Sequence, residues 1–177
     1  MIETSALSRR GLLKVGLFGS ATLATVGLFG SLSGCQAEST ASGFVMLRES
    51  DLPMLRRLVS VVLEGAVAAA DMPMAVQGTL QSLDQGLGHV SPALSRQVSQ
   101  LFDLLSLPLT RGPLTGIWRD WAQADDDAVA AFLTGWESSS FSLMRQGHAS
   151  LLQMIQMAWY GRPESWAHCG YPGPPAI

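Results

Sequence analysis

Apolar residues recur at intervals of three and four in two neighbouring stretches of the chain, residues 47–66 and 72–90. That spacing places the apolar side chains on one face of a helix. In the first stretch Ser50-Asp51 and Pro53 stand at the start of the apolar run, as at a helix N-terminus. The second stretch has Pro73 at its head and two glycines at its tail. The sequence therefore predicts one helix in each stretch. The apolar positions are Leu55, Leu58, Val59, Val62, Leu63, Leu80, Leu83 and Leu87.

Residues 91–108 predict a third helix, because Ser91 suits the N-cap, Pro92 suits the first helical position and Pro108 ends the pattern. Residues 107–121 are interrupted by prolines and glycines. This composition is typical of a connector, although its end can begin a short helix.

Residues 124–161 have apolar positions for one or two helices, and Gly147 either divides the segment or is tolerated within a helix. The run Asp125–Asp127 suits a helix start, where negative charge is favourable. Residues 162–177 are rich in turn residues and are expected to end extended. Period-2 alternation is almost absent. The predicted fold class is therefore all-α, a single domain of about five helices with a Pro/Gly-rich extended C-terminal tail.

Residues 1–35 follow a different pattern, with a basic head, an apolar run and small residues before a cysteine. The head resembles a twin-arginine signal, and an ordinary secretory leader with two arginines is the alternative. The apolar run approaches the ~20 residues of a membrane-spanning helix, but its glycines favour a signal that is removed. The motif residues are Ser8, Arg9, Arg10, Leu12, Leu13 and Lys14.

The leader ends in Leu32-Ser33-Gly34-Cys35, which resembles a lipobox and makes Cys35 the predicted lipidation site. Acyl chains on this cysteine would anchor the protein to a membrane that faces the periplasm. The alternative is a cut near an incidental cysteine. Residues 36–47 begin with small polar residues and predict a flexible tether, and residues 48–177 are the predicted folded domain.

The composition limits the partners of the domain. Charged residues make up 14% of the chain and the net charge is −3. The leader carries Arg9, Arg10 and Lys14 against Glu3, so residues 35–177 have a net charge of about −5. An acidic domain without a basic stripe excludes nucleic acid as a partner. The low charge favours a surface that a protein or a membrane covers in part.

No residue pattern predicts a catalytic or metal site. The three histidines have no metal-like spacing, and the Asp125–Asp127 run lacks the calcium-loop pattern. CxxC, phosphate-loop and dinucleotide motifs are absent. Cys169 is the odd cysteine if Cys35 is lipidated, which leaves a shielded thiol or an intermolecular disulfide. Pairing with Cys35 requires that the lipobox is not used.

The five tryptophans all lie within the last 60 residues of the chain. They suit either core packing or an interface, because large aromatic rings serve both purposes. They are Trp118, Trp121, Trp136, Trp159 and Trp166.

The tail contains Ala158–Trp166 and then Gly170–Pro174. This sequence resembles the closing signature of the gluconate 2-dehydrogenase subunit 3 family, which has an aromatic-Tyr-Gly-x-Pro element, a following Trp and Gly-Tyr-Pro-Gly-Pro. The resemblance extends over most of residues 48–175, but only the tail is specific. The residues that match, and that we expect to bind a partner, are Trp159, Tyr160, Gly161, Pro163, Trp166, Gly170, Tyr171, Pro172, Gly173 and Pro174.

The family consists of small subunits of membrane-associated, flavin-dependent sugar and polyol dehydrogenases. The resemblance implies a subunit without its own cofactor, paired with a large flavoprotein that holds FAD, often alongside a multihaem cytochrome c. It also implies that the small subunit carries the twin-arginine signal for its folded partner. The lipobox departs from the better-known members and would add an anchoring role.

Three functions follow as hypotheses. The favoured one is a non-catalytic accessory subunit that binds a flavin-dependent dehydrogenase of the GMC type and escorts it through the twin-arginine translocase. The second is a stand-alone periplasmic lipoprotein with a structural or ligand-binding role. The third, an enzyme in its own right, has no motif to support it.

Overall fold

The computed structural model describes residues 39–173, so the leader motif, Cys35 and Pro174 lie outside the described residues. The described part is helical and contains no strand, which confirms the all-α prediction. Its elements are α2 (Leu52–Val62), α3 (Met72–Gly88), α4 (Pro92–Ser106), α5 (Pro108–Thr115), the 3-10 helix η1 (Trp121–Gln123), α6 (Asp126–Glu137), α7 (Ser142–Tyr160) and α8 (Pro163–Cys169).

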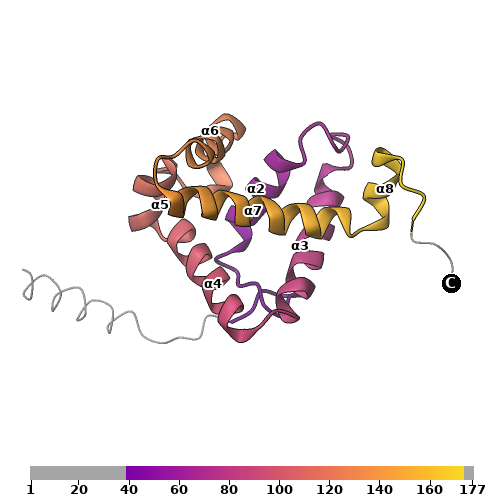
Figure 1. The fold of residues 1–177 in the computed structure, drawn as a ribbon, viewed down its shortest axis with the longest axis horizontal. Coiled ribbons are helices and arrows are strands. Elements are labelled where there is room, and N and C mark those ends of the chain that lie inside the picture. Colours follow the sequence, from indigo (N-terminus) through magenta and orange to yellow (C-terminus); the bar gives the residue numbers. More distant parts are fainter. Residues whose placement is uncertain (1–38, 174–177) are drawn as a thin grey trace, which may run out of the picture. The chain divides into compact units, whose positions relative to one another are not determined.

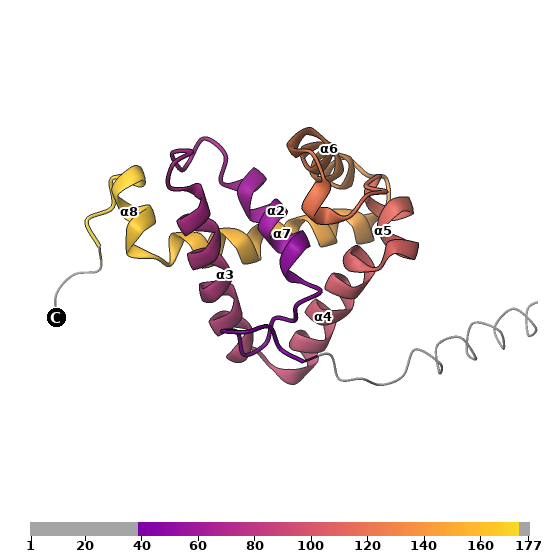
Figure 2. The ribbon, with the colours of Figure 1, turned by 180° about the vertical axis from the view of Figure 1, so that it is seen from behind.

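The core forms around α2 and the long helix α7. Helix α7 packs mainly against α3 and α6, and it also contacts α2. Helix α8 lies at one end of α7, whereas α5 and α6 lie at the other end (Figures 1 and 2). The face of α2 that the apolar pattern predicts is buried, because Leu55, Leu58 and Val59 are each at most 1% exposed.

The predicted starts of α3 and α4 are confirmed. Pro73 lies in the first turn of α3, and Ser91 Oγ accepts a hydrogen bond from the Leu94 amide at the start of α4. Each of these signals acts within one turn of helix, so the neighbouring residues alone are sufficient to predict where the helix starts.

The segment 39–47 belongs to the folded unit, which corrects the predicted tether of 36–47 for these residues, and residues 36–38 lie outside the described residues. Ala41, Phe44 and Leu47 are buried. The buried carboxylate of Asp84 on α3 accepts the amides of Val45, Met46 and Leu47 at 2.8, 2.7 and 2.8 Å. The correction has a long-range cause, because a side chain almost forty residues away satisfies this backbone.

Arg48 ties the same segment to α4. Its guanidinium contacts two carboxylates. Asp51, the residue just before α2, lies at 2.8 Å, and Asp103 on α4 lies at 2.7 Å. The hydrogen bond to Asp51 raises the pKa of Arg48 above its ordinary value, and the bond to Asp103 raises it further against the opposing effect of burial. Asp51 bonds Arg48 in this way and makes no side-chain cap bond to α2, so the expected N-cap role of the Ser50-Asp51 pair is not seen for Asp51.

Residues 108–115 form helix α5, although the sequence predicted a connector there. Pro108 occupies the first turn, where its missing amide costs nothing. Pro113 lies only two residues before the end of the helix, and the left-handed Gly116 (φ 76°) terminates it. Packing against α4 supports this short helix, which buries Arg111 and Thr115. The indole of Trp118, six residues further on, also lies directly against Gly112.

Residues 124–161 form two helices, and the break falls at 138–141 rather than at Gly147. Gly147 lies inside α7, where a Cβ would come within 2.5 Å of the Trp136 ring. The glycine therefore makes room for the indole of α6. The Trp136 Nε1 donates to the carbonyl oxygen of Leu114 at 2.8 Å, which fixes that ring in place.

Candidate functional site

The residues that match the tail signature fold into a corner between α7 and α8. We call residues 159–173 the α7–α8 corner. Pro163 begins α8, and the left-handed Gly170 (φ 68°) follows its last residue. The expectation of a turn-rich, extended tail is therefore wrong for residues 163–169. Proline at the first helical position and glycine just after the last are the usual bounds of a helix, so the local signal was present.

Trp166 holds this corner together. Its Nε1 donates to the carbonyl oxygen of Tyr160 at 3.0 Å, which satisfies one acceptor at the C-terminal end of α7. The Tyr171 amide donates to the Trp166 carbonyl oxygen at 3.0 Å, and the two rings meet edge to face with centroids 5.4 Å apart. A Cβ on Gly173 would lie 3.2 Å from the same indole. Trp166 is half-buried, and its contacts hold the end of α7 and the residues after α8 together.

Arg162 attaches the corner to α3. Its Nη1 donates to the carbonyl oxygen of Gly78 at 2.9 Å and to Ser82 Oγ at 3.3 Å, and its Nη2 pairs with Glu164 at 2.7 Å. A Cβ on Gly78 would come within 2.5 Å of the guanidinium. The absence of a side chain at Gly78 is therefore what allows Arg162 to reach the helix backbone.

The ten predicted contact residues divide into groups. Trp159 is only 4% exposed and packs in the core, so it offers little surface to a partner, and its role in binding stays a prediction. Tyr160 and Tyr171 are 50% and 47% exposed, so their rings are open to a partner. Gly161 is the C-cap of α7, Gly170 follows α8 with a left-handed backbone, and Pro163 and Pro172 are exposed.

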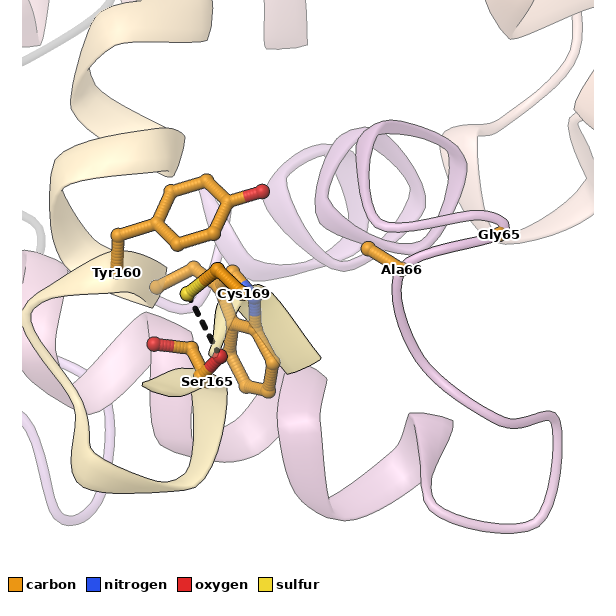
Figure 3. Close-up of a pocket in the computed structure, with 6 residues that line it drawn as sticks. Gly65, Ala66, Tyr160, Ser165 and Cys169 are labelled. Atoms are coloured by element: carbon orange, nitrogen blue, oxygen red, sulfur yellow. Dashed lines mark hydrogen bonds between the residues drawn. The ribbon is translucent and has the colours of Figure 1, made fainter. Parts of the chain in front are cut away.

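A shallow cleft opens beside the corner, with a volume of about 210 Å³. Figure 3 shows Tyr160, Ser165 and Cys169 on one side and Gly65 and Ala66, from the turn after α2, on the other. Trp159 completes the lining. The cleft is smaller than the roughly 300–1,000 Å³ of most small-molecule pockets, and its lining has no charged side chain.

Cys169 lies in the last turn of α8 and is exposed, so the expectation of a shielded thiol is wrong. Its Sγ lies 3.3 Å from the carbonyl oxygen of Ser165 and 3.5 Å from that of Trp166, and both oxygens can accept its hydrogen. The exposed position leaves the thiol open to pairing with another chain, and that disulfide stays a prediction.

The other tryptophans differ in burial, so core packing holds for some of them and the interface role stays a prediction. Trp121 and Trp136 are buried against Phe132, with Trp121 Nε1 donating to the Leu105 carbonyl oxygen at 2.8 Å. Trp118 is 75% exposed at the opposite end of the fold from α8.

Residues 39–173 contain no group of three His, Cys, Asp or Glu side chains that could hold a metal ion. In the same part of the chain, no helix has the length and apolar character that crossing a bilayer requires.

Sequence reasoning missed several residues that build this corner. Arg162 stands at the variable position of the signature, and its partner Gly78 lies outside the predicted motifs. Met157 was also missed, although it is 68% exposed and lies one helical turn before Tyr160. The helical spacing of Met157 and Tyr160 could have identified this pair.

No protein-family model, no curated protein and no solved structure matches the chain.

Proposed function

We propose that this protein is a non-catalytic accessory subunit. It binds a flavin-dependent dehydrogenase of the GMC type, escorts it through the twin-arginine translocase, and helps its maturation and membrane tethering. The leader motif, the lipobox-like Cys35 and the tail signature support this function together. The twin-arginine route suits cargo that folds before export, and this chain has no dinucleotide motif with which to bind FAD itself. The cargo is then a second, FAD-containing polypeptide.

The observation that carries the proposal is the exposure of Tyr160 and Tyr171 on a fixed corner. Both tyrosines contact Trp166, Tyr160 through its carbonyl oxygen and Tyr171 through its ring and amide. Aromatic residues and methionine are enriched at protein interfaces, and Met157 extends the exposed surface by one turn of α7. Because the corner is already ordered, binding would cost little conformational entropy.

The first test separates binding from export. The full chain is co-expressed with a flavin-dependent dehydrogenase of the GMC type from the same genome, and the complex is captured through a tag on this chain. The double variant Tyr160→Ala and Tyr171→Ala is expected to lose the flavoprotein while still reaching the periplasm. Phe141→Ala is the matched control, since it removes a ring that is 68% exposed at the other end of α7.

The second test concerns the leader. Replacing Arg9 and Arg10 by lysine is expected to leave both proteins in the cytoplasm, with the flavoprotein folded and FAD-loaded there. Normal export of the flavoprotein from these cells would exclude an escort role. A chain that is exported, monomeric and never captures a flavoprotein would instead favour a stand-alone lipoprotein.

A further inference from the structure

The first described residues form a closed loop, Ser39–Leu47, which we call the N-terminal loop. Thr40 and Arg48 form an isolated antiparallel bridge, and the Ala41 amide donates to the Leu47 carbonyl oxygen at 2.8 Å. The three amide bonds to Asp84 hold the tip of the loop on α3. The chain therefore cannot be drawn out into a linker here without breaking these bonds and exposing buried side chains.

This folding shortens the connection to the predicted lipid. Cys35 stands four residues before Ser39, and four residues span at most about 14 Å. If the chain were free up to residue 48, the reach would be about 45 Å. A lipid on Cys35 would therefore hold the N-terminal loop within reach of the bilayer surface.

The surface of the loop suits such a position. Ser39–Leu47 contains no charged side chain. Val45 and Met46 are 75% and 36% exposed, although their amides are bound to Asp84. The Asp84 carboxylate is buried beneath the loop. Among the described residues, Glu49 is the exposed acid nearest to the loop in the sequence, and its Oε1 accepts the Ser42 amide at 3.2 Å.

We propose that the N-terminal loop is a membrane-contact surface, with Val45 and Met46 entering the lipid interface beside the anchor. This proposal rests on the proposed lipidation of Cys35. It adds that the domain is held against the bilayer in one orientation, whereas a long tether would let it tumble. Two apolar side chains are a weak membrane ligand alone, but attachment through the anchor gives them a high effective concentration at the bilayer.

The test uses the mature protein made from the full chain, extracted from membranes and reconstituted into vesicles of phosphatidylethanolamine and phosphatidylglycerol. Val45→Cys in a Cys169→Ser background carries a fluorophore, and brominated lipids act as the quencher. Leu109→Cys in the same background is the control, since Leu109 is 88% exposed on α5. We expect lipid quenching to be severalfold stronger at position 45 than at position 109. Inserting about twelve Gly and Ser residues before Ser39 should reduce quenching at 45 without releasing the protein from vesicles.

The outcomes separate the two ideas. Two results with lipidated protein would overturn the contact surface and leave the anchor intact. One is equal quenching at positions 45 and 109, and the other is quenching at position 45 that the inserted linker does not reduce. Protein whose N-terminal peptide carries no lipid, and which does not stay with vesicles, overturns both the anchor and the surface. Aqueous iodide, a quencher that stays in water, shows what covers the label at position 45. If the flavoprotein protects the label from iodide and the vesicles do not, the loop binds that partner and the proposal is also overturned.

Discussion

The guanidinium of Arg162 lies against Gly78, 84 residues earlier in the chain, and donates a hydrogen bond to its carbonyl oxygen at 2.9 Å. This contact joins the α7–α8 corner to α3. Trp166 holds the corner together, and Arg162 attaches it to α3. Tyr160 and Tyr171 are therefore attached to the same folded unit as the core.

Gly78→Ala should therefore loosen the corner. The added Cβ would meet the guanidinium at 2.5 Å. Because the guanidinium is the far end of a flexible side chain, it can move aside, and the cost is that of its lost hydrogen bond to Gly78, about 0.5–1.5 kcal/mol. The free energy of unfolding from urea titration measures the loss. Gly86→Ala on the same helix is the control. It meets no atom within 4 Å, so it should stabilise the protein by about 0.5–1 kcal/mol. Equal effects of the two changes would contradict the contact.

Asp84→Ala removes the acceptor of three amides and should release the N-terminal loop. Hydrogen bonds to a charged group contribute about 1.5–3 kcal/mol each in favourable cases, with incomplete additivity. We expect a loss of stability at least as large as one such bond, together with faster amide hydrogen exchange at Val45, Met46 and Leu47.

Asp84→Asn should have a smaller effect than Asp84→Ala. One oxygen of Asp84 accepts both Met46 and Leu47, and the other accepts Val45. An amide side chain can keep the first pair but presents a donor to the Val45 amide. Hydrogen exchange should thus rise more at Val45 than at Leu47. Uniform exchange across the three positions would contradict this assignment of the oxygens.

Gly147→Ala should destabilise the protein even though alanine is the better helix former. The Cβ would meet the Trp136 ring at 2.5 Å, and the hydrogen bond from Trp136 Nε1 to Leu114 restrains that ring. The expected cost is about 1–3 kcal/mol. Gly135→Ala, one residue before the same tryptophan, meets nothing within 4 Å and should be stabilising. Thermal unfolding of the two variants provides the comparison.

Trp166→Phe removes the donor to the Tyr160 carbonyl oxygen while it keeps an aromatic ring near Tyr171. The loss of one hydrogen bond costs about 0.5–1.5 kcal/mol. Because α8 is at the end of the fold, it can open without global unfolding. Amide hydrogen exchange at Tyr171 is the suitable measurement, and it should increase while exchange in α2 stays unchanged. Trp118→Phe, at an exposed site, should change neither.

The sequence by itself determined the all-α class and the starts of α3 and α4. These features depend on apolar periodicity and on caps such as Ser91, which act within a turn or two of helix. The bounds of α8 were also encoded locally by Pro163 and Gly170. They were missed because the proline- and glycine-rich composition suggested an extended tail.

Only the tertiary structure decided which residues of the tail signature face outward. Trp159 and Tyr160 are adjacent in the sequence, yet α7 turns the first into the core and leaves the second half exposed. The folding of the N-terminal loop depends on Asp84, and the position of the α7–α8 corner depends on Gly78. Contacts between residues so distant in the chain leave no periodic pattern in the sequence. They depend on which side chains are buried and which backbone groups pair once the whole chain has folded.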